Sequence, residues 1–229
     1  LDEHNQALLD LVRPKGWKDP TPLALYDLVV VGAGAAGLVS SKQAARRGAK
    51  VAFITEHLAG GDCLNVGCVP SKALIRSARA VREARRAAEF GVILEGPIKV
   101  DFPAIMERMR CLRAKIAPAD SHEGTASTGA HVFQGRGRFI NDHSVSVNGK
   151  VLNFKKAIIA TGGRAAVPDY PGLSSVSYLT NATIFNLTSL PESLCILGGG
   201  AVGLEMAQCF ATFGSRVTVV LRGPCLFHK

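Results

Sequence analysis

Two glycine-rich turns with the same spacing, Gly-x-Gly-x-x-Gly, constrain most strongly what this chain can fold into. One occupies residues 32–37 and the other residues 198–203. Each follows an apolar run that suits a buried parallel strand, and each leads into a helical pattern and then a second apolar run. The sequence therefore predicts two strand–helix–strand units and an α/β fold.

Each glycine of the first turn has a separate physical role. Gly32 permits the tight turn after the strand YDLVVV, Gly34 lets the backbone approach a ligand, and Gly37 allows the helix to pack closely on the strand. The free N–H groups at the start of the following helix favour a bound pyrophosphate. Because the helix leads back to a second strand at 50–55, we predict a dinucleotide site here.

An acidic residue is expected at the end of the second strand, where it would bind the ribose hydroxyls of the dinucleotide. Thr55 occupies the strand end and Glu56 follows it. We take Glu56 as the candidate, although a shift of one residue along a strand turns the side chain to the opposite face. The alternative is that Glu56 is an ordinary surface acid.

The second turn, formed by Gly198, Gly200 and Gly203, predicts a second nucleotide site. Glu205 follows it in the helical pattern, and the next strand ends without an acid before Arg222. An arginine in this position suits a 2′-phosphate, so we expect NADPH, with NADH as the alternative. In the second case Arg222 is simply an exposed residue.

These patterns divide the chain into three parts. Residues 1–26 contain a short helix and three prolines and are expected to form an N-terminal arm. Residues 27–175 are expected to form a Rossmann-like domain with a β-meander, in which Asn148-Gly149 marks a type I′ hairpin turn. Residues 176–229 hold only two strands and a helix, so we expect the start of a second Rossmann-like domain that is truncated.

Cys63 and Cys68 stand close together in the glycine-rich segment GGDCLNVGCVPSK. Cys68 precedes a helical pattern at 71–90, and Pro70 suits the first turn of that helix. The positive end of a helix stabilises a thiolate, and Lys72 lies about one turn further on. We therefore predict a reactive thiol at Cys68, with Cys63 as the more exposed partner that meets substrate. The other cysteines are expected to be small core residues: Cys111, Cys195, Cys209 and Cys225.

The composition narrows the class of protein further. The net charge is +9 and 47% of the residues are hydrophobic, as in ordinary globular proteins. The arginines between 76 and 86 follow a helical pattern and are expected on a solvated face, so we expect no nucleic-acid partner. No apolar run suits a membrane span and no secretory signal is present, so we expect a cytoplasmic protein. No second Cys/His pair completes a zinc site, and we expect no structural metal.

The segment GGDCLNVGCVPSK resembles the redox signature of the class I pyridine nucleotide-disulfide oxidoreductases. Other elements of that family follow in the same order along the chain: the first glycine turn, the cysteine pair, Ala160-Thr161-Gly162, and the second turn with Glu205. The resemblance covers the chain from Tyr26 onward. Thr55 departs from it, because relatives usually have glutamate there.

The resemblance implies that NAD(P)H reduces FAD, that FAD reduces the Cys63–Cys68 pair, and that the pair reduces the substrate. Cys68 would be the charge-transfer thiol and Cys63 the interchange thiol, and Lys72 and Glu205 would be the pair that lies near the flavin and the nicotinamide. The positions expected to contact FAD are Gly32, Gly34, Ala35, Gly37, Glu56, Gly61, Asp62, Cys63, Lys72, Ala160, Thr161 and Gly162. Those expected to contact NADPH are Gly198, Gly200, Gly203 and Arg222.

The resemblance leaves several substrates open. The tail VTVVLRGPCLFHK and the segment GCVPSKALIRSAR are most similar to mercuric reductases, and mercury(II) is a soft ion that prefers thiolates. We therefore expect Hg(II) as a substrate held by Cys63 and Cys68, and a homodimer in the full-length protein. One alternative is a dihydrolipoyl dehydrogenase acting on a disulfide. Another is a truncated flavin- and thiol-binding protein without turnover.

Overall fold

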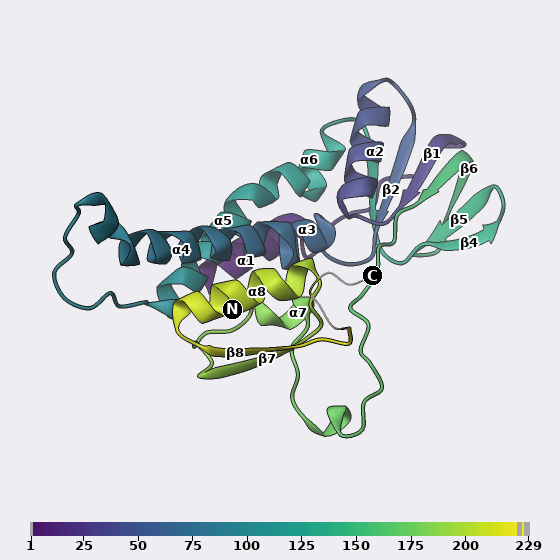
Figure 1. The fold of residues 1–229 in the computed structure, drawn as a ribbon. Helices are drawn as coiled ribbons and strands as arrows, with labels where there is room; N and C mark the ends of the chain where they lie inside the picture. The colour runs from purple at the N-terminus through teal and green to yellow at the C-terminus, as the bar shows by residue number, and fades with distance from the viewer. Residues whose placement is uncertain (1, 224–225, 227–229) are drawn as a thin grey trace. The chain divides into compact units, whose positions relative to one another are not determined.

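The structure is a computed structural model that describes residues 2–223 and residue 226 (Figure 1). Cys225, expected in the core, lies outside the described residues, as does most of the segment that follows Gly223. Among the described helices, none is both long enough and apolar enough to cross a membrane.

Two compact units make up the chain. Unit 1 comprises residues 1–67 and 113–178, and unit 2 comprises residues 68–112 and 179–229. The long helix α5 (Phe102–Asp120) crosses the division between them. The two units are defined by how the residues pack. The division into an arm and two nucleotide-binding domains, expected from the sequence, is a different one and stays a prediction.

Unit 1 is built on one mixed sheet whose strand order is β3-β2-β1-β6-β5-β4. Strands β1, β2, β3 and the second half of β6 are parallel, and β4, β5 and the first half of β6 form an antiparallel meander. This is the Rossmann-like arrangement with a meander that the sequence predicted. Its strands are β1 (Tyr26–Val31), β2 (Val51–Thr55), β3 (His131–Gln134), β4 (Arg138–Asn141), β5 (Ser144–Val147) and β6 (Lys150–Ile159). Its helices are α1 (Glu3–Val12), α2 (Ala35–Arg46), α3 (Gly61–Val66), α6 (His122–Ala126) and η2 (Leu173–Ser175).

Alternation along β1 directs its side chains into two separate cores. Val29 and Val31 join one cluster together with Val145 and Leu152 of the meander. Val30 points to the other face, where α2 supplies Leu38 and Ala45. Since successive strand residues point to opposite faces, the apolar run at the end of β1 needs cover on both sides. The meander and α2 provide that cover.

Strand β6 belongs to both parts of the sheet, because it is one continuous strand of 10 residues. Its first part pairs with β5, from Lys150 opposite Val147, and its later part pairs with β1, up to Ile159 opposite Val31. The predicted hairpin turn is confirmed, because Asn148 and Gly149 both have positive φ, at 49° and 76°.

The N-terminal residues are packed into unit 1. Leu8 and Val12 of α1 are buried. The indole Nε1 of Trp17 donates to the carbonyl of Val132 at 3.0 Å, and a carboxylate oxygen of Asp19 accepts from the backbone N–H of Gln134 at 2.8 Å. These bonds tie the segment after α1 to strand β3.

Unit 2 contains a two-stranded parallel sheet, β7 and β8, beside helix α8. Cys209 on α8 is buried, as predicted, but Cys195 on β7 is exposed. The prediction for Cys195 was wrong because β7 alternates between exposed and half-buried residues in this small sheet, so its outer face lacks cover. The elements of unit 2 are α4 (Cys68–Arg85), η1 (Ala87–Phe90), α7 (Asn181–Ile184), β7 (Ser193–Leu197), α8 (Ala201–Phe213) and β8 (Arg216–Val220).

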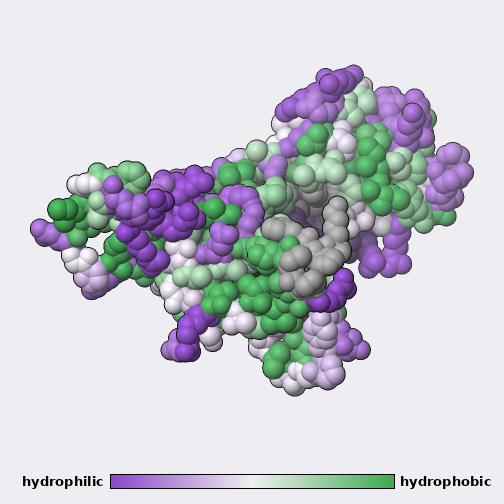
Figure 2. Space-filling view, viewed as in Figure 1, coloured by the Kyte–Doolittle hydropathy of each residue, from purple (hydrophilic) through white to green (hydrophobic). Residues whose placement is uncertain are grey.

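The helix that follows the cysteine pair differs from its predicted span of 71–90. Helix α4 begins at Cys68 and ends at Arg85, and a short 3-10 turn follows. Figure 2 shows hydrophobic and hydrophilic residues beside one another near the end of α4. The arginines of α4 are exposed, as predicted from their helical pattern. Large apolar side chains are also exposed just beyond it: Phe90, Val92, Ile93, Leu94 and Ile98.

A buried histidine makes the stability of unit 1 depend on pH. His122 is 1% exposed and its ring lies edge-on to Trp17, with a centroid distance of 5.1 Å. Burial lowers the pKa of His122 to about 4, and Asp19 and a backbone contact with Leu11 offset this only in part. The unfolded chain therefore binds a proton near pH 6.5 that the folded chain does not take up until about pH 4.

We expect the free energy of unfolding to fall as the pH drops from about 6.5 to about 4, by an amount on the order of 3 kcal/mol. His122→Phe should remove this contribution, and urea unfolding across that pH range measures it. His143→Gln, at an exposed histidine, is the control and should keep the wild-type slope. Identical pH slopes for wild type and His122→Phe would contradict the prediction.

Candidate functional site

The first glycine turn is packed too tightly for side chains at two of its three glycines. A Cβ atom on Gly32 would collide with the carbonyl of Ala160, and one on Gly37 would collide with the carbonyl of Gly32. Gly32 also has a φ of +113°, which disfavours any other residue. Gly34, by contrast, precedes the first residue of α2, Ala35, and the nearest atom to a Cβ there is 4.0 Å away. Gly34 therefore leaves open space at the positive end of α2.

Two further predicted cofactor segments lie beside this turn. A Cβ on Gly61 would come within 2.5 Å of the Cα of Gly34, so the two glycines touch through their backbones. The backbone N–H of Ala160 donates to the carbonyl of Val31 at 2.7 Å, which holds the end of β6 beside the end of β1. The structure thus brings Gly61 and Ala160, predicted from separate parts of the sequence, to the same edge of the sheet. Asp62 follows Gly61 in α3, and Thr161 and Gly162 follow Ala160.

The acid at the end of β2 has a partner that sequence reasoning missed. Thr55 is fully buried and its hydroxyl donates to the carbonyl of His57 at 3.1 Å. Glu56 is exposed, and its carboxylate lies 3.8 Å from Nε of Arg136. Arg136 stands between two glycines just after β3. An arginine between two glycines at the carboxyl end of a parallel strand was the sequence feature from which this contact could have been predicted.

The two cysteines occupy consecutive helices. Cys63 lies in α3 and is partly buried, whereas Cys68 is the first residue of α4 and is exposed. The predicted order of exposure was therefore wrong, because α3 continues through Cys63 and its backbone is close to Gly67. The position of Cys68 at the start of a helix of 18 residues agrees with the prediction.

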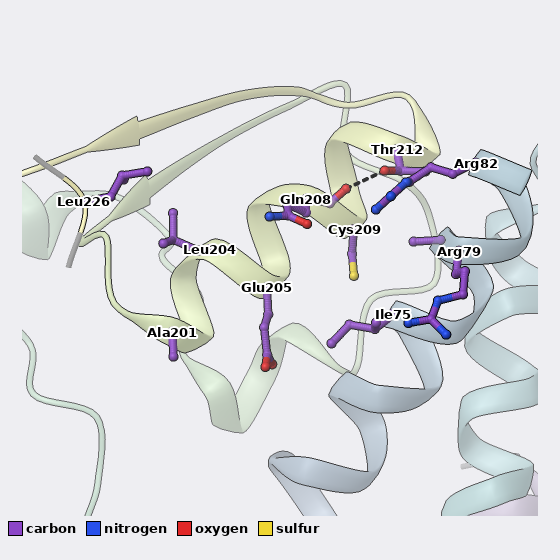
Figure 3. A pocket seen from close by; sticks show the side chains of 11 residues that line it. Ile75, Arg79, Arg82, Ala201, Leu204, Glu205, Gln208, Cys209, Thr212 and Leu226 are labelled. Atoms are coloured by element: carbon purple, nitrogen blue, oxygen red, sulfur yellow. Dashed lines mark hydrogen bonds between the residues drawn. The ribbon is translucent and has the colours of Figure 1, made fainter. Parts of the chain in front are cut away.

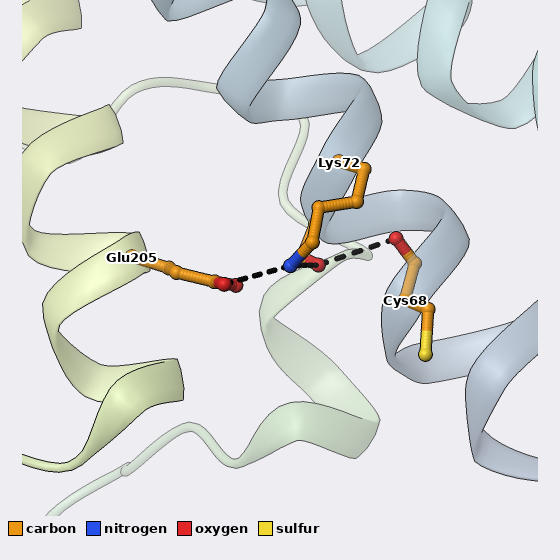
Figure 4. Close-up of polar contacts among 4 residues, drawn as sticks. Cys68, Lys72 and Glu205 are labelled. Carbon is orange, nitrogen blue, oxygen red and sulfur yellow. Dashed lines mark hydrogen bonds and ion pairs between the residues drawn. The ribbon is translucent and has the colours of Figure 1, made fainter.

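Lys72 and Glu205 form an ion pair, with 2.7 Å between Nζ and Oε1 (Figure 4). They are separated by 133 residues in sequence and join α4 to α8 within unit 2. The Lys72 ammonium also contacts the hydroxyl of Ser71, which donates to the carbonyl of Cys68. The Lys72 ammonium was expected to stabilise the Cys68 thiolate, but it contacts the carboxylate of Glu205.

The second glycine turn resembles the first at its last two glycines, whereas a Cβ on its first glycine, Gly198, would meet no atom within 4 Å. Gly198 has a φ of +109°, and a Cβ on Gly203 would lie 2.6 Å from the carbonyl oxygen of Gly198. Gly200 precedes α8 and has no atom within 4 Å of a Cβ position. Arg222 is exposed just beyond β8. The turn therefore leaves its open position at the start of a helix, where a nucleotide pyrophosphate fits.

A groove of about 520 Å³ lies between α4 and α8 (Figure 3). Glu205 and Cys209 line it from α8, and Arg79 and Arg82 line it from α4. Burial, reinforced by Glu205 and opposed by Lys72, raises the pKa of Cys209 to about 11. Cys209 is therefore a neutral thiol near pH 7, which suits the core role predicted for it rather than that of a nucleophile.

A parallel sheet with an open glycine turn before α2, and a second such turn before α8, defines a dinucleotide-binding protein of the Rossmann type. The sequence profile of the family described as pyridine nucleotide-disulphide oxidoreductase matches residues 26–229. The chain belongs to this family, whose members use FAD and NAD(P)H.

Individual relatives carry two different activities in their names. This chain is 34% identical over 203 residues to a dihydrolipoyl dehydrogenase of Acholeplasma laidlawii. The match covers 85% of this chain and 59% of that relative. This chain is also 38% identical over 202 residues to a mercuric reductase of Streptomyces lividans. That match covers 86% of this chain and 43% of the relative. The chain thus spans about half the length of the curated relatives it matches.

A solved structure agrees with the fold. The Cu(II) complex of the HOCl-induced flavoprotein disulfide reductase RclA from Escherichia coli has a TM-score of 0.74 and 29% sequence identity. The match covers 88% of this chain and 43% of that protein.

Proposed function

We propose that this protein transfers two electrons from NADPH, through FAD and the Cys63–Cys68 pair, to Hg(II). The observation that carries the proposal is the position of Cys63, two residues after Gly61, whose backbone touches Gly34 of the first glycine turn. A cofactor bound at that turn would lie next to the thiol pair. The net reaction converts NADPH and Hg(II) into NADP⁺, a proton and Hg(0), so two electrons leave the nicotinamide and two reach the metal.

FAD fits the first turn because Gly34 leaves space at the N-terminus of α2, where backbone N–H groups and the helix dipole favour its pyrophosphate. When bound, it supplies the two-electron step between NADPH and the cysteine pair. Glu56, paired with Arg136, is the acid available for its ribose hydroxyls. Ala35, Asp62, Thr161 and Gly162 are proposed as further contacts.

The thiol pair supplies the substrate chemistry. Two thiolates suit a soft ion such as Hg(II), and Cys68 at the start of α4 benefits from the helix dipole. Lys72 and Glu205 join this helix to α8, which begins at the NADPH turn. We propose that the ion pair sets the position of α4, and hence of Cys68, relative to the nicotinamide site. We also propose a homodimer in the cytoplasm.

Dihydrolipoyl dehydrogenase activity is the second candidate, favoured by the similarity to the relative from Acholeplasma laidlawii. In that reaction the pair would exchange with the disulfide of lipoamide. The thiol chemistry at Cys63 and Cys68 would be the same, and only the acceptor would differ.

The deciding experiment follows NADPH oxidation by the FAD-loaded protein with Hg(II) plus excess thiol, then with lipoamide. Turnover with Hg(II) that is lost in Cys63→Ala supports the proposal. Turnover with lipoamide but not with Hg(II) replaces it by the second candidate. Stoichiometric FAD binding without turnover of either acceptor overturns both and leaves a flavin- and thiol-binding protein.

Arg222 is expected to select NADPH over NADH. A guanidinium at this position pairs with the 2′-phosphate, so Arg222→Ala should raise KM for NADPH by about tenfold or more while KM for NADH stays unchanged. Steady-state kinetics with both nucleotides measure this. Arg216→Ala, at the opposite end of β8, is the matched control and should behave like wild type. An equal rise of both KM values in Arg222→Ala would refute the role.

A further inference from the structure

Helix α5 has an arginine among its buried residues. Its buried positions are Phe102, Met106, Met109, Arg113 and Ala117, which follow helical spacing. Arg113 is only 5% exposed. A charge is costly to bury unless hydrogen bonds compensate it, so the contacts that its guanidinium makes demand an explanation.

The guanidinium joins two other elements of unit 1. Its Nη1 donates to the carbonyl of Asn65 in α3 at 2.7 Å, and its Nη2 donates to Oδ1 of Asn5 in α1 at 2.6 Å. Both distances are short, as expected for hydrogen bonds from a charged donor. The planar fork of an arginine reaches two acceptors in fixed directions, which a lysine ammonium does less well.

Asn65 passes this restraint to the turn before Cys63. It is 4% exposed, and its side-chain amide donates to the carbonyls of Ala59 and Gly61 at 3.0 and 2.9 Å. Gly61 is the residue whose backbone touches Gly34. One chain of hydrogen bonds therefore runs from Arg113 through Asn65 to the junction between α3 and the first glycine turn.

Helix α3 needs such support because it has only six residues. An isolated helix of that length is unstable in water, and its last carbonyls lack partners within the helix. Arg113 binds one of these carbonyls with a positive charge, at the end of the helix where a cation is favourable. Cys63 lies in the middle of this helix, two residues before Asn65.

We propose that Arg113 is a positioning residue for Cys63: it holds α3, and with it the Cys63 thiol, at a fixed place beside the first glycine turn. The proposal rests on the redox role of Cys63 proposed above. Helix α1 contributes to this restraint, because Oδ1 of Asn5 accepts the hydrogen bond from Nη2 of Arg113. The segment before the first strand is then part of the support of the thiol pair.

The test measures how fast iodoacetamide alkylates Cys63 in the reduced protein, as a ratio to Cys195 in the same molecules. Cys195 is exposed in unit 2 and serves as the internal reference. Arg113→Met should raise the ratio by about tenfold, since α3 would open more often. Arg113→Lys and Asn5→Ala should raise it by smaller factors. In the FAD-loaded protein, kcat should fall in these variants while KM for NADPH stays the same.

Circular dichroism identifies the variants that fold. If Arg113→Met does not fold, Arg113→Lys and Asn5→Ala provide the test. A ratio within twofold of wild type in every folded variant would overturn the positioning role. The alkylation ratio does not depend on turnover. If Cys63→Ala retained full activity while the ratio still rose in Arg113→Lys, the redox proposal would fail and the restraint on α3 would stand.

Discussion

Replacing either member of the thiol pair by serine should abolish NADPH-dependent reduction of the acceptor, lowering kcat by about 10³-fold or more. Serine keeps the approximate size of the side chain but cannot form the disulfide that is proposed to carry the electrons. The FAD affinity of Cys63→Ser and Cys68→Ser should stay close to wild type, because the glycine turn proposed to receive the pyrophosphate is unchanged. Acceptor-dependent NADPH oxidation and an FAD titration measure the two effects separately.

Cys111→Ser and Cys195→Ser are the matched controls, since both residues are cysteines outside the proposed site. They should retain wild-type turnover. Substantial acceptor reduction by Cys63→Ser or Cys68→Ser would show that electrons leave the protein without passing through this pair, and the proposed route would have to be abandoned.

Two glycines of the first turn should respond to alanine in opposite ways. In Gly37→Ala the new methyl group meets the backbone carbonyl of Gly32, so the backbone has to shift. We expect this variant to lose about 3 kcal/mol or more of its free energy of unfolding. In Gly34→Ala the nearest atom is 4.0 Å away, and the loss should be within about 1 kcal/mol.

Gly34→Ala should nevertheless weaken FAD binding by about 100-fold, because its methyl group fills the space that the pyrophosphate would approach. Urea unfolding and FAD fluorescence titration together separate the two glycines. Gly200→Ala and Gly203→Ala repeat the comparison at the second turn, with NADPH as the ligand. Unchanged FAD affinity in a stable Gly34→Ala would mean that the cofactor does not approach this turn.

The features that the sequence predicted correctly are local ones. The tight turn at Gly32 and the close helix packing at Gly37 follow from their spacing, since a tight turn from strand to helix requires small residues at fixed intervals. The Asn148-Gly149 turn is equally local, because two residues with positive φ are encoded by the dipeptide itself. Pro70 likewise marks a helix just after the cysteine pair, although this helix begins before the predicted residue 71.

Features that depend on packing between distant segments were missed or wrong. No periodicity distinguishes Arg113 from a surface arginine, and only the meeting of α5 with Asn5 and Asn65 supplies the acceptors that allow its burial. The greater exposure of Cys68 than of Cys63 depends likewise on where α3 and α4 begin.

The sequence by itself therefore determined the family and the two glycine turns, because both depend on residues that lie close together in the chain. Only the tertiary structure decided that Arg136 meets Glu56 and that a groove opens between α4 and α8. Each of these joins segments from different parts of the chain. Such contacts depend on how strands and helices pack in space, and the local spacing of residues does not encode this packing.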